Sequence, residues 1–361
     1  MNNMSTLQIS LALVGALVLL AVVAHSAWSS RRNLPKRPVP DAAPRQEPAG
    51  AVNPGDGPAA DEQVHRQEPS FDTDADLSAL AKRTTAEKRP ALDTLIDAMA
   101  SVVLESLVSG DAALAAMPST RRAGSKPFGV EGLSASTGEW EFPVAGQRYS
   151  AFQCGVQLAN RMGALNQIEY SEFVIKTQAF ADALGAEAEF PEMLDEVARA
   201  RELDQFASGH DAQLSFTLRA MHAAWSPGYV QQSAARIGFV AGSMPGRMVL
   251  PASQAGHAPI LGLLFDTQAA MADDPEQTAL REITLSLDVP QVLRTEQPFV
   301  RMCEAALALA ASMDGAIIDD NGNLIRAEAM EAIHTDLEQL YDTLDARELA
   351  AGSALGRRVF S

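Results

Sequence analysis

The residues that most resemble an ion-binding constellation lie in the stretch DDNGNLIRAE near the C-terminus. If Gly322 is set at the sixth position of a calcium loop, Asp319 and Asn321 take positions three and five, and Glu328 takes position twelve. Position one is then Ile317, whose side chain offers no oxygen ligand. Asn-Gly is also the strongest short-range signal for a tight β-hairpin. The pattern therefore favours a hairpin, and we predict no metal site here.

Other signs of catalysis are missing from the sequence. The six histidines show no metal-ligand spacing: His25, His65, His210, His222, His257 and His334. The chain has no G-x-S-x-G motif, no phosphate-binding loop and no dinucleotide fingerprint. Its two cysteines, Cys154 and Cys303, are too few for a disulfide framework and suit a reducing compartment. We therefore predict that the protein is not an enzyme and uses neither a metal nor a cofactor.

A long apolar segment near the N-terminus predicts a membrane anchor at residues 7–28. The first thirty residues contain no Asp, Glu, Lys or Arg. A helix over this segment spans about 33 Å, enough to cross a hydrocarbon core of about 30 Å. A cleaved signal peptide, which has a preceding positive charge and a shorter apolar core, fits less well, as does a buried helix. The residues assigned to the anchor are Leu7, Leu13, Leu17, Leu20 and Trp28.

The basic residues that follow predict the orientation of this anchor. Arg31, Arg32, Lys36 and Arg37 come directly after it. Lysine and arginine concentrate on the cytoplasmic side of a membrane. We therefore expect a single-pass protein with its N-terminus in the periplasm and its C-terminal part in the cytoplasm.

Residues 29–90 are predicted to form a disordered Pro-rich linker. The range 31–90 holds nine of the twenty prolines and few large apolar residues, so it cannot offset its chain entropy by burial. Such a chain has an r.m.s. reach of about 40–50 Å. Its ten acidic and ten basic residues cancel, so the net charge of −18 belongs to residues 91–361. An acidic region of this kind is repelled by nucleic acid and anionic lipid, which favours a protein partner.

The remaining chain reads as two related α+β modules, at residues 91–207 and 208–346, with a tail at 347–361. Each module reads as a strand and a short helix, then several strands and two helices, and we expect Asp111 to cap the first short helix. SEFVIKTQAFADAL in the first module resembles QPFVRMCEAALALA in the second. The alternative is a coincidence between two Ala-rich helices. The strand AQLSFTLRA alternates apolar and polar residues, as a half-buried strand does.

This layout resembles that of the ZipA family of bacterial cell-division proteins. The similarity is sharpest over residues 211–345. It rests on Gly238-Phe239, Met244, LGLLFD, ITLSLDVP, the helix and hairpin ALALAASMDGAIIDDNGNLI, and the final EAMEAIHTDLEQLYD, in that order.

The resemblance implies an antiparallel sheet covered by helices on one face. The bare face then carries a shallow apolar groove for the C-terminal peptide of FtsZ, the tubulin-like division protein. The implied role is a tether that links FtsZ filaments to the inner membrane at mid-cell. Other division-ring partners remain open, as does a scaffold that binds a different envelope or division protein.

The same resemblance places the peptide-binding residues. Met244 matches a groove methionine, and Ser286 stands near the position of a groove aromatic. Phe265 falls at a small-residue position, and we expect it to lie on the bare face as the principal anchor, with Met244 second. The further residues assigned to the site are Leu263, Thr267, Thr284, Ser286 and Arg219. Because this face looks polar, a shifted site or a site in the first module stays open.

Overall fold

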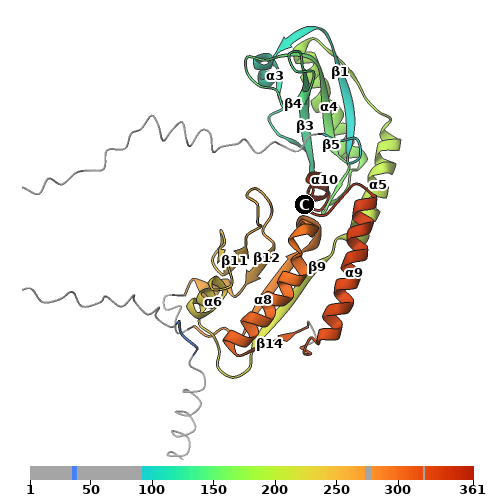
Figure 1. Cartoon of the computed structure of the whole chain (residues 1–361). Helices are drawn as coiled ribbons and strands as arrows, with labels where there is room; N and C mark the ends of the chain where they lie inside the picture. Colours follow the sequence, from blue (N-terminus) through green and yellow to red (C-terminus); the bar gives the residue numbers. More distant parts are fainter. Residues whose placement is uncertain (1–34, 39–91, 273–277, 320–321) are drawn as a thin grey trace, which may run out of the picture. The chain divides into compact units, whose positions relative to one another are not determined.

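Figure 1 shows the computed structural model, which describes residues 35–38, 92–272, 278–319 and 322–361. These residues form antiparallel sheets and helices, as the predicted α+β class requires. The predicted anchor at 7–28, Arg31, Arg32 and most of the linker lie outside the described residues. Within the described ranges, no helix is long and apolar enough to cross a membrane.

The first module contains a six-stranded sheet with the order β2-β3-β5-β1-β8, and β4 pairs with β3. Its elements are β1 Asp97–Ser109, α3 Gly110–Ala116, β2 Arg122–Ala123, β3 Lys126–Ser134, β4 Trp140–Glu141, β5 Arg148–Gln157, β6 Ala159–Asn160, β7 Gly163–Ala164, α4 Gln167–Leu184, β8 Glu187–Glu189 and α5 Met193–His210. The short β6 and β7 form a ladder of their own.

Local side-chain chemistry sets the helix starts in this module. Asn166 and Glu169 form a capping box at α4. The spacing of Phe173, Thr177, Phe180 and Leu184 predicts one buried stripe, and the first three are buried while Leu184 is half-buried. The predicted cap of α3 is wrong, because the hydroxyl of Ser109, not Asp111, accepts the N–H of Ala112.

The second module contains a six-stranded sheet with the order β10-β11-β12-β13-β9-β14. Its elements are β9 Gln213–Ala220, α6 Pro227–Ala235, β10 Val240–Ala241, β11 Arg247–Leu250, β12 Leu261–Leu264, α7 Thr267–Ala270, β13 Glu282–Asp288, η1 Val289–Gln291, η2 Arg294–Glu296, α8 Pro298–Met313, β14 Gly315–Ile318 and α9 Ala327–Ala346.

Corresponding strands have the same spatial order in both sheets. In each six-stranded sheet, the strand that opens the module, β1 or β9, lies between the last strand of that sheet before the long helix and the strand that follows the helix. That gives β5-β1-β8 around α4 and β13-β9-β14 around α8. Such a shared order is what the duplication hypothesis predicts.

Helix α8 covers one face of the second sheet, where it packs on β9, β13 and β14 (Figure 1). The strand residues under it alternate with exposed ones, as period two requires. The buried set is Phe216, Leu218, Ile283, Leu285 and Leu287, against Met302, Ala306 and Leu309 of the helix. The rings of Phe216 and Phe299 meet edge to face at 6.2 Å.

The described residues on either side of Asp320 and Asn321 contact one another. Ile318 bridges Leu324, the N–H of Asn323 bonds to the Asp319 carboxylate at 2.8 Å, and Gly322 has φ 82°. The positive φ is the reason for a glycine there. Asn321 lies outside the described residues.

The segment assigned as a tail, 347–361, instead contains a helix, α10 Ala354–Val359. Val359 and Phe360 are buried, and Arg358 pairs with the fully buried Asp97 of β1. The amide of Gln157 also donates to the Arg358 carbonyl at 2.7 Å. The last residues of the chain thus contribute to the core of the first module.

Candidate peptide-binding site

Helix α8 packs on one face of the second sheet. No helix in the described part of the chain packs on the opposite face, which we call the open face. Cross-strand pairing aligns its side chains in two rows. The first row is Ser215, Ser286, Gly262, Val249 and Val240. The second row is Ile318, Thr217, Thr284, Leu264 and Arg247.

The middle of this face is low because its residues are small. Gly262 has no side chain, and the Ser286 hydroxyl donates to its carbonyl at 3.3 Å. A Cβ at Gly262 would stand 2.7 Å from the Ser286 Oγ. Higher apolar residues flank this floor, with Leu264 39 % exposed and Val240 49 % exposed. We call the floor of Gly262, Ser286 and Ser215, with the wall of Leu264, Val249 and Val240, the trough.

The turn between β10 and β11 extends the apolar wall. Met244 lies in this turn and is 55 % exposed. A thioether side chain adapts its shape to an apolar partner. The side chain of Met244 is therefore accessible, and its role as the second peptide anchor stays a prediction.

Charges on the open face favour an acidic ligand at one end. Arg219 is already paired, because its Nε lies 2.6 Å from Oε1 of Glu282. Arg247 stands beside Leu264 in the second row and is exposed. It forms no ion pair with any residue that the structure describes. A carboxylate of a peptide in the trough would meet Arg247 first.

Residues 265–336 match the family model of the ZipA C-terminal FtsZ-binding domain. The resemblance to the ZipA family is thereby confirmed. The matched segment runs from the end of β12 through β13, α8 and β14 into α9, so it supplies Ser286 and Thr284 to the open face. Strands β9 to β12 precede it. No curated protein matches the chain.

Two residues that the ZipA resemblance placed at the groove lie elsewhere. Phe265 is only 8 % exposed and belongs to the core, and Leu263 is fully buried. In β12, Leu261 and Leu263 point to the covered face, and Phe265 continues that series. The expectation that Phe265 is exposed is therefore wrong. Successive residues of a strand face opposite sides of the sheet, and Leu264, one position earlier, is the residue that points outward.

The remaining predicted site residues divide between the open face and its surroundings. Thr284, Ser286 and Arg219 lie together on the open face. Thr267 is exposed but lies at the start of α7, which Asp266 caps. The residues that the sequence reasoning missed are Gly262, Leu264 and Val249. The alternation of LGLLFD was the available signal for Gly262 and Leu264, once it is known which leucines are buried, and it carries no signal for Val249.

In the first module, the corresponding face is occupied by the chain itself. Gly129, Gly155 and Met99 form a cross-strand row there. A Cβ at Gly129 or Gly155 would stand 3.0 or 2.7 Å from the Cδ2 of Leu92, so this side chain lies directly on both glycines. The N–H of Leu92 bonds to the Glu131 carboxylate at 3.0 Å. The part of this face over Gly129 and Gly155 is therefore covered by Leu92.

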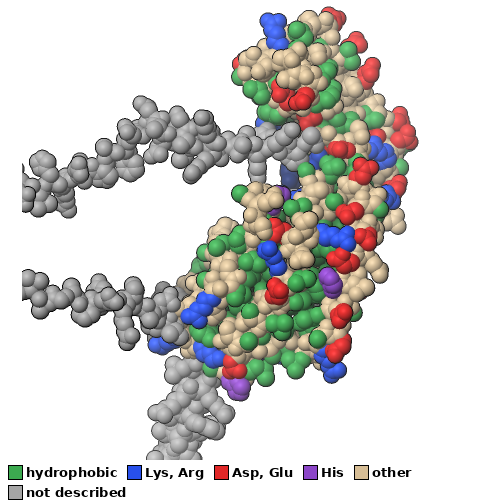
Figure 2. Space-filling view, in the orientation of Figure 1, with side chains coloured by type: hydrophobic (Ala, Val, Ile, Leu, Met, Phe, Trp, Pro, Cys, Tyr) green, Lys and Arg blue, Asp and Glu red, His purple; other side chains and the backbone are tan. Residues whose placement is uncertain are grey.

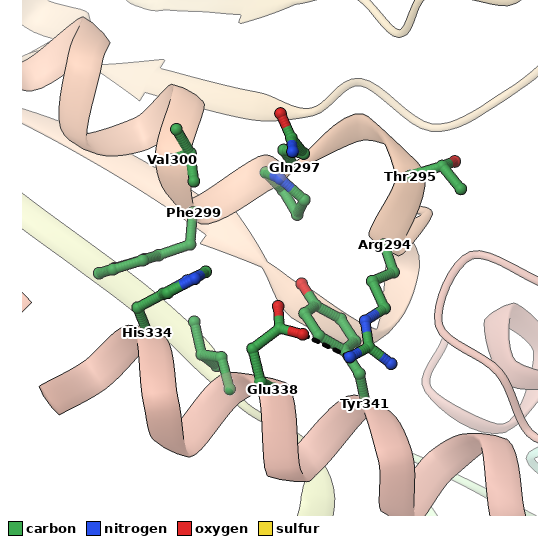
Figure 3. A pocket seen from close by; sticks show the side chains of 10 residues that line it. Arg294, Thr295, Gln297, Phe299, Val300, His334, Glu338 and Tyr341 are labelled. Carbon is green, nitrogen blue, oxygen red and sulfur yellow. Dashed lines mark hydrogen bonds and ion pairs between the residues drawn. The ribbon is translucent and has the colours of Figure 1, made fainter. Parts of the chain in front are cut away.

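A second hollow, of about 480 Å³, lies between the start of α8 and α9 (Figure 3). Its lining residues are Arg294, Thr295, Gln297, Pro298, Phe299, Val300, His334, Leu337, Glu338 and Tyr341. Figure 2 shows hydrophobic side chains gathered over α8 and acidic ones along α9. Arg294 pairs with Glu338 and Asp342 of α9, so this side of the hollow carries one more negative than positive charge.

The hydroxyl of Tyr341 lies in this hollow and has no hydrogen-bond partner among the described residues. Burial raises the pKa of Tyr341 to about 12. Gln297, which precedes α8, has φ 51° and gives the helix no side-chain cap. The hollow therefore combines apolar walls with one buried hydroxyl, that of Tyr341, which has no hydrogen-bond partner among the described residues.

We predict that Tyr341→Phe raises the free energy of unfolding by about 1 kcal/mol. The reason is that a buried hydroxyl without a partner costs desolvation energy, which phenylalanine avoids. Chemical denaturation of the full chain in detergent measures the change. Tyr229→Phe is the matched control, because the hydroxyl of Tyr229 does donate, to the Ser312 carbonyl at 3.1 Å. A loss of stability in Tyr341→Phe would mean that this hydroxyl has a partner in solution.

Proposed function

We propose that the protein tethers FtsZ filaments to the inner membrane of a dividing bacterium. In this proposal, the trough of the second module binds the C-terminal peptide of FtsZ. The observation that carries it is the coincidence of the FtsZ-binding family match with the open face. This face has a small floor, an apolar wall and Arg247, which forms no ion pair with the described residues. Such a tether needs no catalysis and no cofactor.

The expected affinity follows from the size of such a groove. A peptide that buries roughly 300–400 Å² of apolar area gains about 8–10 kcal/mol at about 25 cal/mol per Å². Loss of translational freedom and ordering of side chains remove several kcal/mol. Binding at micromolar concentration, or about −8 kcal/mol, is therefore expected at best. Many tethers along one filament strengthen such a weak contact.

The membrane half of the proposal rests on the predicted anchor at 7–28 and the basic residues after it. A reporter that is active only in the periplasm, fused after Ser361, is expected to be silent. The same reporter fused before the anchor, after Met4, is the matched control and is expected to be active. An active reporter after Ser361 contradicts the orientation, and two silent reporters contradict the membrane crossing.

We predict that only the second module responds to the FtsZ peptide. In the full chain labelled with ¹⁵N-glycine, the resonance of Gly262 should shift on addition of the peptide. Gly129 and Gly155 should not shift, because Leu92 already covers them. Shifts at Gly129 and Gly155 with none at Gly262 would transfer the site to the first module.

A second candidate function is a scaffold that binds another division or envelope protein. The hollow between α8 and α9 favours it, because the Tyr341 hydroxyl lies there without a partner. The FtsZ peptide separates the two candidates. A trough ligand loses affinity in variants of the open face, whereas a ligand of the hollow loses affinity in Tyr341→Phe and not in open-face variants.

A further inference from the structure

A short piece of the basic segment that follows the predicted anchor lies on the second module. Lys36 pairs with Trp225 as a parallel bridge. Its N–H donates to the Ala224 carbonyl at 2.7 Å, and its carbonyl accepts the N–H of Ser226 at 2.9 Å. On its other side Trp225 pairs with Leu280 through two hydrogen bonds of 2.8 Å. Lys36 is thus the outer member of a three-part backbone ladder.

The side chain of Lys36 makes a second, independent contact. Its ammonium group donates to the carbonyl of Met313, the last residue of α8, at 2.8 Å, and lies 3.5 Å from the Asp314 carboxylate. The fully buried Trp225 donates its indole N–H to the same Met313 carbonyl. A cation at this place also suits the negative end of the helix dipole.

The groups around the Lys36 ammonium include a carboxylate, that of Asp314, and a histidine, His222. His222 and Lys36 both contact Asp314, and the hydrogen bond from His222, more than Lys36, lowers the pKa of that carboxyl. Asp314 therefore stays ionised at neutral pH. On either side of Lys36, Pro35 is buried, and the Pro38 ring lies 3.3 Å from where a Cβ of Gly228 would stand. The segment 35–38 thus has a fitted slot, formed by Trp225, Gly228 and the end of α8.

We propose that residues 35–38 are an intramolecular ligand of the second module, which clamps it close to the membrane. Only six residues, 29–34, separate Trp28 from Pro35, so the span between them is at most about 25 Å. With the clamp closed, the chain between the predicted anchor and the module is only as long as residues 29–34. With the clamp open, it comprises the whole range 29–91, for which the sequence predicts a reach of about 40–50 Å.

Docking of residues 35–38 in the slot therefore sets the distance from the membrane within which the module can bind its partner. The membrane position in this argument rests on the proposed function, but the docking of residues 35–38 does not. Because part of the contact is ionic and partly exposed, added salt weakens it. Lys36 would then have two roles, as a topology signal and as the side chain that holds the clamp.

Hydrogen exchange of the full chain in detergent micelles, read by mass spectrometry, tests the docking. The amides of Lys36 and Ser226 should exchange at least tenfold more slowly than those of residues 41–90. Lys36→Pro removes both the N–H donor and the ammonium group without changing the module, so Ser226 should lose its protection. Arg37→Ala is the matched control, because it removes an equal charge that forms no ion pair with the part of the chain that the structure describes.

Two results would overturn the clamp. One is an amide of Lys36 that exchanges as fast as residues 41–90, and the other is a Ser226 amide unaffected by Lys36→Pro. Neither readout involves FtsZ or a bilayer, so each stands apart from the proposed function.

The reach is tested separately in lipid vesicles. Energy transfer from a fluorescent protein fused after Ser361 to acceptor lipids should fall in Lys36→Pro and not in Arg37→Ala. Equal transfer in all three proteins would contradict the change in reach.

Discussion

Replacing Arg358 by methionine is expected to lower the free energy of unfolding by about 3–5 kcal/mol. The guanidinium of Arg358 holds both carboxylate oxygens of Asp97, at 2.5 and 2.9 Å, and Asp97 is fully buried. Burial raises the pKa of Asp97, and Arg358 opposes that rise. Methionine keeps the length and apolar contacts of the stem but leaves the carboxylate without its cation. Urea denaturation of the full chain in detergent measures the loss.

The pH dependence of this loss has a definite sign. Without Arg358, the pKa of Asp97 in the folded protein rises further above that of the unfolded chain. The folded variant therefore binds a proton that the unfolded chain releases, and its stability falls as pH rises through the folded pKa. The deficit of Arg358→Met should accordingly shrink as pH is lowered from 7 towards 4.

Arg347→Met is the matched control for the buried pair. Arg347 lies 3.5 Å from Glu202, and both side chains are more than half exposed. Such a pair contributes at most about 1 kcal/mol. The double variant Arg358→Met with Asp97→Asn should recover part of the loss, since no buried charge remains. If Arg358→Met costs no more than Arg347→Met, the C-terminal segment does not stabilise the first module through this pair.

The contribution of this segment could not be predicted from the sequence. Arg358 and Asp97 are 261 positions apart, and α10 is too short for a periodic signal. Longer elements were predictable because their periodicity repeats. The alternation in β9 and β13 gave both faces correctly, and the apolar stripe of α4 is buried where its spacing places it.

The candidate site could be predicted only in part for a similar reason, because its strands are short. Strand β12 has four residues, so LGLLFD alternates too briefly to fix which leucine points outward. Its phase comes from the pairing of Gly262 with Ser286 and of Leu264 with Thr284. Likewise, neither Leu92 nor Lys36 belongs to a periodic segment, and only tertiary contacts reveal that Leu92 covers one sheet and Lys36 docks on the other module.

The corrected register makes a sharp prediction about binding. Leu264→Asp is expected to weaken binding of the FtsZ C-terminal peptide by about 10–100-fold. Removing an apolar anchor of this size costs about 1.5–3 kcal/mol, and the new carboxylate stands beside Arg247, which it would neutralise. Titration of the full chain with a labelled peptide, followed by fluorescence anisotropy, measures the change.

Two further variants separate binding from folding. Leu307→Asp is the matched control, because Leu307 is 56 % exposed on α8, away from the open face, and should bind the peptide as the wild type does. Phe265→Ala should instead lower the free energy of unfolding by about 3–5 kcal/mol, since Phe265 is a core side chain. Leu264 is already 39 % exposed, so Leu264→Asp should cost only about 1 kcal/mol of stability, from the poor strand propensity of aspartate. If folded Leu264→Asp binds the peptide as tightly as Leu307→Asp does, the trough is not the binding site, and the hollow around Tyr341 takes its place.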